Sequence, residues 1–138
     1  MFISLTRLRL RHWWKLPEFL WRSIRSMSQA RASEGYIEGS TLGDRQRTFW
    51  TMTAWESEAA MKAYRGAGAH KAAMKKLPSW CDEACVAHYN SDSLPSWSEA
   101  WEHMMKNGRF TPVNHPSHAH IEKRIEPPRI PPKLHRKI

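Results

Sequence analysis

The sequence predicts an α+β fold, in which four short antiparallel strands and two helices follow one another in the order β-α-β-β-α-β, with a third helix and an extended tail after them. Two observations lead to this prediction. Short runs in which apolar and polar residues alternate, as along a strand, are separated by longer runs with apolar residues at helical spacing. Glycine or proline lies at most of the junctions between these runs. A chain of 138 residues accommodates one domain of this kind and not two.

Residues 2–10 form the first predicted strand, because Arg7 and Arg9 alternate with apolar residues along it, which is typical of a half-exposed strand. Residues 17–32 form the first predicted helix, which begins with a proline and ends before Gly35. Its apolar side chains at helical spacing are Phe19, Leu20, Ile24 and Met27.

Two strands are expected next, over residues 35–42 and 47–55, joined by a glycine–aspartate turn at positions 43–44. Successive residues of a strand point to opposite faces, so Trp50 and Trp55 are expected on opposite sides of the sheet. These runs therefore predict a hairpin that places large aromatic side chains on both faces.

The stretch TAWESEAAMKAYRGAGAHKAAM, residues 53–74, predicts the second helix and an interruption within it. Its first acidic residues suit the positive end of a helix dipole. Gly66 and Gly68 then fall in an alanine- and lysine-rich helix, where each costs roughly 0.5–1 kcal/mol relative to alanine. We expect a break there, with a second short helix starting near His70. Two reasons for the break stay open: placing His70 for chemistry, and close packing against a neighbouring element.

A strand over residues 83–89 and a helix over residues 96–108 complete the pattern. The order β-α-β-β-α-β is that of the ferredoxin-like split βαβ arrangement. Its two helices cover one face of the sheet, so aromatic side chains of residues 49–55 are expected on an uncovered face. A large uncovered apolar face predicts a partner, most simply a second copy related by two-fold symmetry.

The net charge of +9 lies mainly at the C-terminal end, since residues 106–138 carry eight Lys or Arg and two Glu, whereas residues 1–105 carry fourteen Lys or Arg and eleven acids. The body is thus nearly balanced, and nucleic acid is not expected as a partner.

The sequence contains no run of 18 apolar residues, so no membrane span is predicted. Arginines inside the apolar N-terminal stretch argue against a signal peptide. Cys81 and Cys85 are expected as free thiols, and the expected location is the cytoplasm.

The chain is expected to divide into a folded domain, residues 1–108, and a basic, proline-rich tail, residues 109–138. The tail holds most of the prolines, few large apolar residues and none of the eight tryptophans, so it is expected to be extended or disordered. His115, His118 and His120 lie close together in it, but without cysteine or carboxylate support they do not predict a metal site.

The pattern FWTMTAWESEAAMKAYRGAGAHKAAM, residues 49–74, resembles the antibiotic biosynthesis monooxygenase-like family of the dimeric α+β barrel superfamily. The resemblance is carried by the strand ending in Trp55-Glu56-Ser57, the helix start at Ala59-Ala60-Met61, and Gly68-Ala69-His70. It covers about residues 2–90. The resemblance implies a homodimer of ferredoxin-like subunits, each with a pocket between its sheet and its helices. The superfamily includes cofactor-independent oxygenases and haem-binding and haem-degrading enzymes.

His70 is the candidate acid or base. On one continuous helix it shares a stripe facing the sheet with Ala63, Ala67, Met74 and Leu77. The structural alternative is a buried histidine hydrogen-bonded to a carbonyl or to a hydroxyl such as that of Thr51 or Thr53. Similarity to haem-degrading relatives implies a third role, in which His70 ligates the iron and Tyr64 contacts the macrocycle. The spacing between the two is shorter than in those relatives, and their polar distal residue has no counterpart here.

The leading hypothesis is a small-molecule-binding protein that acts as a cofactor-independent monooxygenase on an aromatic or polyketide-like substrate, which itself supplies the electrons to oxygen. His70 is the expected catalytic group, and the expected pocket walls are Trp50, Trp55, Tyr64 and His88. No metal or cofactor is expected, with haem bound by His70 as the alternative. A non-catalytic binding or stress protein that works through its tail is the third hypothesis, so whether the chain is an enzyme stays open.

Overall fold

A computed structural model describes residues 1–44, 46–129 and, for the backbone alone, 135–137. In these residues the strands form one antiparallel sheet in the order β5-β4-β1-β3-β2-β6. The strands are β1 (Phe2–Leu10), β2 (Tyr36–Asp44), β3 (Thr48–Trp55), β4 (Cys81–Asn90), β5 (Arg109–Phe110) and β6 (His135–Lys137). The helices are η1 (Trp13–Lys15), α1 (Leu16–Ala32), α2 (Glu58–Arg65), α3 (Gly68–Trp80), α4 (Trp97–Asn107) and α5 (His118–Ile121).

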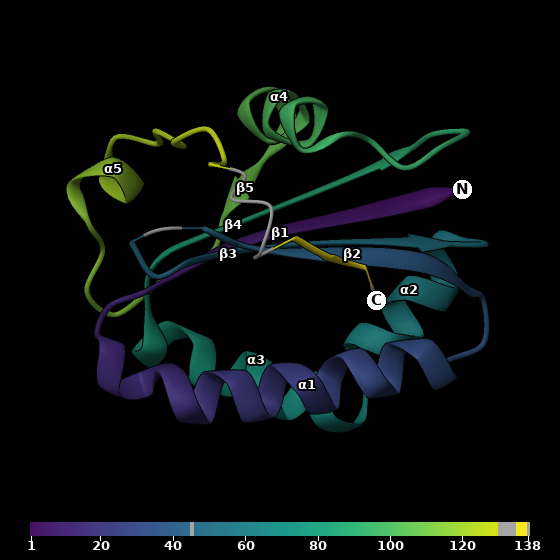
Figure 1. The fold of residues 1–138 in the computed structure, drawn as a ribbon, viewed down its shortest axis with the longest axis horizontal. Coiled ribbons are helices and arrows are strands. Elements are labelled where there is room, and N and C mark those ends of the chain that lie inside the picture. The colour runs from purple at the N-terminus through teal and green to yellow at the C-terminus, as the bar shows by residue number, and fades with distance from the viewer. Residues whose placement is uncertain (45, 130–134, 138) are drawn as a thin grey trace.

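The sheet lies between two layers (Figure 1). Helices α1, α2 and α3 cover one face, the helix-layer face, and α4 and α5 lie on the opposite side, the α4 face. Strand β1 is central, with β4 on one side and β3 on the other. The element order confirms the predicted α+β class, a ferredoxin-like βαββαβ subunit followed by a C-terminal helix.

Local capping sets where two of the helices begin. The hydroxyl of Ser57 accepts a hydrogen bond from the backbone N–H of Ala60 at 3.1 Å, which starts α2 directly after β3. At α4, Ser96 and Glu99 form a reciprocal capping box, with bonds of 3.1 and 3.2 Å. Ser96 is therefore the N-cap of this helix.

The hairpin between β2 and β3 differs from its prediction. The glycine–aspartate pair at 43–44 continues β2 and does not form the turn. The chain reverses just beyond it, where Gln46 and Arg47 both have a φ of 65°. Side-chain and backbone contacts hold this conformation, since the Arg47 guanidinium and carbonyl bond the carbonyl and N–H of Leu10 at 2.9 Å each.

The α4 face holds a closed apolar core. Leu5 on β1 is 0% exposed and Trp50 on β3 is 1% exposed. The indole of Trp97 on α4 packs against that of Trp50, with ring centroids 6.5 Å apart. The other buried members of this cluster are Ile3, Leu42, Met52, Ala54, Cys85, Ala87, Ala100, Met104 and Ile125. The sheet face expected to lie uncovered is therefore covered, within the described residues, by α4 and Ile125 of the same chain.

A buried ion network continues the α4 face. The Arg7 guanidinium bonds the Glu83 carboxylate at 2.8 Å, and Arg9 bonds its other oxygen at 2.7 Å. The Ser117 hydroxyl donates to Glu83 at 2.8 Å. Burial alone would raise the pKa of Glu83, but these hydrogen bonds and the two arginine charges hold that pKa below its usual value. The prediction that both arginines lie on an exposed face is thus wrong for Arg7, which is 4% exposed.

The described part of the tail is ordered against the body. Phe110 on β5 pairs with Cys85 on β4. Ile125 is 6% exposed, and its carbonyl accepts a hydrogen bond of 2.8 Å from the indole of Trp101. Residues 109–129 therefore help to cover the α4 face, held by Phe110 and Ile125 and by backbone hydrogen bonds such as those from Thr111 to Ala84 and from Ser117 to Asp82. Residues 130–134 and 138 of the predicted tail lie outside the described residues.

The helices of the described residues are all too short or too polar to cross a membrane.

Candidate functional site

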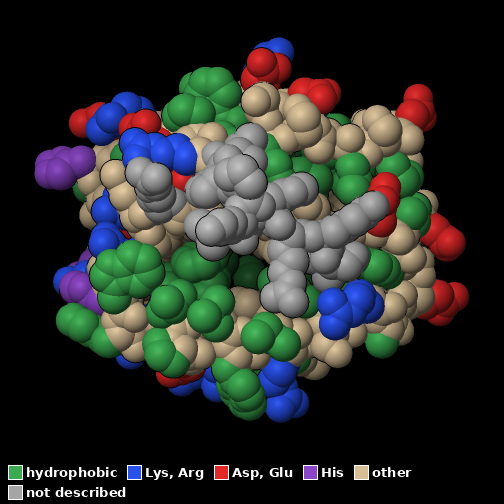
Figure 2. All heavy atoms as spheres, viewed as in Figure 1, with side chains coloured by type: hydrophobic (Ala, Val, Ile, Leu, Met, Phe, Trp, Pro, Cys, Tyr) green, Lys and Arg blue, Asp and Glu red, His purple; other side chains and the backbone are tan. Residues whose placement is uncertain are grey.

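The middle of the helix-layer face is incompletely packed. Ser4 and Thr6 lie on β1, which has a hydrogen-bonded strand on each side, yet both side chains stay partly exposed beneath the helices. Thr51 on β3 and Val86 on β4, which pair with Thr6, are half-buried as well. Figure 2 shows a hollow between the sheet and α1, with hydrophobic side chains gathered around it. We call the region of the helix-layer face around Ser4, Thr6, Thr51 and Val86, which stay partly exposed beneath the helices, the sheet–helix gap.

Two apolar clusters bound this gap at its ends. One is built around Trp55, with Phe2, Ala30 and Met61. The other joins the first turn of α1 to the end of α3 and comprises Leu10, Phe19, Leu77, Trp80, Cys81 and Ala84. Small hydroxyl side chains lie between large apolar ones, so a ligand in the gap would meet aromatic walls and a few hydrogen-bonding groups, which is the usual composition of a small-molecule pocket.

The two glycines mark a real break between α2 and α3, as predicted. Gly68 has a φ of 57°, in the left-handed region, and begins α3. The Gln29 side chain of α1 fills the break: its amide nitrogen donates to the carbonyls of Tyr64 and Ala67 at 3.1 and 2.8 Å, and its oxygen accepts from the N–H of His70 at 2.9 Å. A Cβ at Gly68 would lie 3.1 Å from that oxygen. Close packing by Gln29 thus accounts for the glycine at 68.

His70 is half-buried at the start of α3. Its Nδ1 lies 3.1 Å from the carbonyl of Arg65, the last residue of α2, so Nδ1 carries the proton in the neutral ring and Nε2 is left as an acceptor. Its ring tilts against that of Tyr64, with centroids 4.6 Å apart. Burial, aided by the charge of Arg65, lowers the pKa of His70 despite that hydrogen bond. His70 therefore links the two helices and is neutral at pH 7.

The break also shifts the buried stripe of α3. Below His70, the side chains that turn inward are those of Ala73, Leu77 and Trp80. Ala63, Ala67 and Met74, predicted to share the inner face, are all exposed. The prediction ran one continuous helix through residues 63–77. In the structure α2 turns Met61 and Tyr64 inward, and the break at the glycines gives α3 a different rotational phase from α2.

Trp55 and Tyr64 form the wall nearest to His70. Their rings stack with centroids 5.0 Å apart. The indole N–H of Trp55 bonds the hydroxyl of Thr53 at 2.9 Å, and the hydroxyl of Tyr64 bonds the carbonyl of Ser26 at 3.1 Å. Burial raises the pKa of Tyr64 above its usual value, so it stays a neutral phenol. Both polar tips are satisfied internally. Trp55 is 0% exposed, so this pair is a packed boundary of the site and offers a ligand no free indole face.

His88 lies on the same face of the sheet, at the end of β4. It pairs with Ser4 and stacks on the ring of Phe2, with centroids 5.7 Å apart. Burial and the charges of Arg65 and Arg109 lower the pKa of His88. A second neutral imidazole therefore lies near the cluster around Trp55.

Trp50 lies on the other side of the sheet from the remaining predicted site residues. It pairs with Arg7 and belongs to the core of the α4 face, where the Arg7 guanidinium lies 5.8 Å from its ring centroid. The idea that His88 shares an interior with Trp50 is wrong, because His88 pairs with Ser4 and so points to the helix layer. The structure brings together Trp55, Tyr64 and His70, with His88 nearby.

Gln29 and Tyr36 are the residues of this region that the sequence did not single out. Tyr36 packs edge-on against Trp55, with centroids 5.6 Å apart. Gln29 is a polar residue within the predicted first helix, and nothing in its neighbouring sequence indicates that it bonds residues 64–70. Ser4 and Thr6 alternate with apolar residues along β1, but the sequence does not show that they face the sheet–helix gap, because the gap depends on how the helices pack over the sheet.

Haem does not fit this site well. A histidine whose Nδ1 bonds a carbonyl is arranged as metal-ligating histidines are. However, the Tyr64 ring lies against the imidazole, with centroids 4.6 Å apart, and occupies space that a macrocycle beside His70 would need. Elsewhere in the described residues, His, Cys, Asp and Glu side chains form no group of three placed to hold a metal ion.

Comparisons with known proteins identify the fold. No protein-family model and no curated protein matches the sequence. A putative antibiotic biosynthesis monooxygenase from Nitrosomonas europaea matches with a TM-score of 0.60 and 12% identity, over 67% of this chain and 100% of that one. The chain has the fold of antibiotic biosynthesis monooxygenase-like proteins.

Two further solved structures agree with this assignment. SnoaB, a cofactor-independent oxygenase from Streptomyces nogalater, matches with a TM-score of 0.56 and 12% identity, over 69% of this chain and 97% of that one. A conserved protein from Methanosarcina mazei Go1 matches with a TM-score of 0.59 and 14% identity, over 66% of this chain and 92% of that one. The shared part is thus nearly the whole of each relative, while about a third of this chain lies outside it.

Proposed function

We propose that the chain binds an apolar or aromatic small molecule in the sheet–helix gap and acts on it as a cofactor-independent monooxygenase. The observation that carries this proposal is the half-buried Ser4 and Thr6 at the centre of a helix-covered sheet face. Natural interiors are close-packed, so small polar side chains left partly accessible there indicate space kept for a ligand. The fold shared with SnoaB, a cofactor-independent oxygenase, supports the choice of reaction class.

His70 is the proposed general base. Its Nε2 accepts the proton of a phenolic or similarly acidic substrate, while the Nδ1 bond to the Arg65 carbonyl keeps the ring oriented. The substrate anion then reduces O₂: a methylene carbon becomes a carbonyl, one oxygen atom enters the product, and the other leaves as water. The stacked rings of Trp55 and Tyr64 close the end of the gap beside His70 and exclude water.

Oxygen uptake by the full chain with hydroxylated polycyclic aromatics tests the proposal. The decisive variant is His70→Asn, because the asparagine amide can still donate to the Arg65 carbonyl but cannot accept a proton. We expect it to fold normally and to lower kcat by about 10²–10⁴-fold. In the parent protein, kcat/KM should fall as the pH drops through the lowered pKa of His70, and this acid limb should vanish in the variant.

A second variant locates the binding site. Thr6→Leu fills the gap and should abolish binding of 1-naphthol, measured by quenching of tryptophan fluorescence. Ser98→Leu, an exposed position on α4, is the matched control. Retained turnover in His70→Asn would assign His70 a purely structural role, and retained binding in Thr6→Leu would place the ligand elsewhere.

A homodimer is part of the proposal, on the strength of the family resemblance alone. The face expected to form it is occupied by α4 and Ile125 of the same chain. Light scattering of the purified chain gives the mass directly, and a monomer would show that α4 has replaced the second subunit. A cytoplasmic location likewise stays a prediction, supported by the free thiols of Cys81 and Cys85.

A further inference from the structure

The outer surface of the helix layer exposes most of the large apolar side chains that are accessible in the described residues. Trp14 is 71% exposed, Ile24 63% and Trp21 55%. The same surface also exposes Trp13, Leu20 and Met74. Ile24 lies three residues after Trp21 and four after Leu20, so these three side chains form one stripe along α1. These three side chains point away from both the sheet–helix gap and the apolar core, so neither explains why they are apolar.

The same surface is strongly positive. Residues 11–32 and 68–80 together hold eight Lys or Arg and one Glu, a net +7, whereas the rest of residues 1–105 holds six Lys or Arg and ten acids. On α3 the lysines at positions 71, 75 and 76 are all exposed, and that helix contains no acidic residue. In Figure 2, Lys and Arg side chains lie beside hydrophobic ones along the rim formed by the helix layer.

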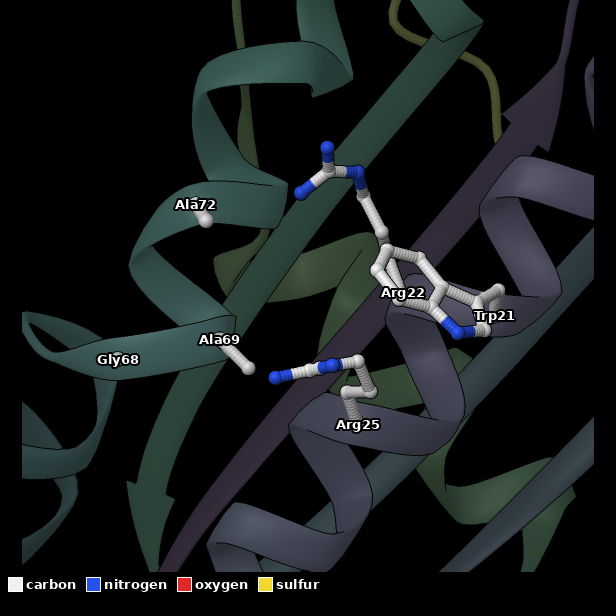
Figure 3. Close-up of a pocket in the computed structure, with 6 residues that line it drawn as sticks. All are labelled: Trp21, Arg22, Arg25, Gly68, Ala69 and Ala72. Carbon is white, nitrogen blue, oxygen red and sulfur yellow. The ribbon is translucent and has the colours of Figure 1, made fainter.

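A cavity of about 400 Å³ opens in this surface between α1 and α3. Trp21, Arg22 and Arg25 line it from α1, and small residues of α3 face them (Figure 3). The guanidinium carbons of Arg22 and Arg25 lie 5.6 and 5.0 Å from the Trp21 ring centroid. Two cations around an exposed indole make a cavity suited to an anionic headgroup, with the indole at the level of the lipid interface.

We propose that the outer surface of α1 and α3, with η1 beside it, docks on a bilayer that contains anionic lipids. Trp21, Leu20 and Ile24 enter the interface, and the arginines and lysines bind the lipid phosphates. An amphipathic helix with Trp, Ile and Leu on one stripe and Lys or Arg beside it is the arrangement that lies in the plane of a membrane surface. The chain docks without crossing the bilayer.

Two other occupants fit less well. Single-stranded nucleic acid also attracts cations and tryptophans, but Leu20 and Ile24 offer nothing to a base. A second copy of this chain would bring one strongly positive surface against another, which is unfavourable. An anionic bilayer satisfies both the charge and the aliphatic side chains.

Vesicle flotation with the full chain tests this proposal. We expect binding to phosphatidylcholine vesicles that contain phosphatidylglycerol, at least tenfold stronger than to phosphatidylcholine alone, and strongly weakened at high salt. Arg25→Gln should weaken binding about fivefold, as expected for the loss of one cation near the surface. Ile24→Ser should weaken it by roughly tenfold through loss of apolar insertion.

The matched controls lie on α4, where Met105 is 54% exposed and Lys106 is exposed beside it. Met105→Ser and Lys106→Gln should leave vesicle binding unchanged, and circular dichroism checks the fold of all four variants. Equal binding to both vesicle types, or Ile24→Ser and Arg25→Gln variants that bind as the parent does, would overturn the proposal. Competition by millimolar glycerol phosphate would identify a soluble anion as the ligand, and tighter binding to single-stranded RNA through the same residues would identify nucleic acid instead.

Discussion

The two faces of the sheet are built from the same strands but are packed in opposite ways. On β1, Leu5 points to the α4 face and is 0% exposed, whereas the adjacent Thr6 points to the helix layer and is only half-buried. The α4 face is closed by apolar packing and by the ion network around Glu83. The helix-layer face keeps a gap between two aromatic clusters. The difference indicates that stability is concentrated on one face, while the other has space available for a ligand.

The largest expected effect comes from the buried carboxylate. Glu83→Ala leaves the Arg7 guanidinium buried without its partner and is expected to cost about 3–5 kcal/mol of unfolding free energy. The exposed pair Glu58–Lys62, with a 3.1 Å contact, is the control: Glu58→Ala should cost less than about 0.5 kcal/mol. Urea denaturation measures both. Similar losses at the two positions would show that the α4 face is not the rigid half.

The pH dependence of stability follows from the same group. The pKa of Glu83 is lowered in the folded state, so its contribution is fully present above the unfolded value of 4.5 and is lost as the pH falls through the folded value. Urea denaturation across this acid range should show a loss of stability in the parent chain that Glu83→Ala lacks. Parallel curves would contradict the assignment.

Adjacent residues of β1 give the next comparison. Leu5→Ala removes a fully buried side chain and should cost about 2–5 kcal/mol. Thr6→Ala trims the lining of the gap and should cost less than about 1 kcal/mol, since no close-packed contact is lost. Thermal melts of the two variants measure the difference. Equal costs would mean that the gap is as tightly packed as the core.

The two glycines give the smallest comparison, in which only one substitution is expected to destabilise the fold. Gly68→Ala should cost about 1–2 kcal/mol, because its φ of 57° disfavours a side chain and a Cβ would crowd Gln29. Gly66 has a φ of −87°, and a Cβ there would meet only the Lys62 carbonyl, at 3.4 Å. Gly66→Ala should therefore be neutral or stabilise by up to about 1 kcal/mol. Destabilisation by both would mean that flexibility at the break, and not its geometry, is what the fold requires.

Within residues 2–107 the sequence by itself determined the order and approximate bounds of the main elements, because strand and helix periodicities and caps such as Ser57 and Ser96 are local signals. It also indicated the break before His70 and the separate faces of Trp50 and Trp55. It did not predict β5, α5 or β6 in the tail.

Only the tertiary structure decided which of these side chains meet. The α4 face is closed because α4 and Ile125 fold back onto it. The periodicity of a helix or strand shows which of its faces is apolar, but not which other element packs against that face. Gln29 reaches His70 from 41 positions away, so the histidine's partners could not be read locally. Charge behaves in the same way: residues 1–105 are nearly balanced in number, yet folding sorts the cations of α1 and α3 onto one surface. The net charge of a long stretch of sequence adds together residues that lie on different sides of the folded protein, so it cannot show that one surface is strongly positive.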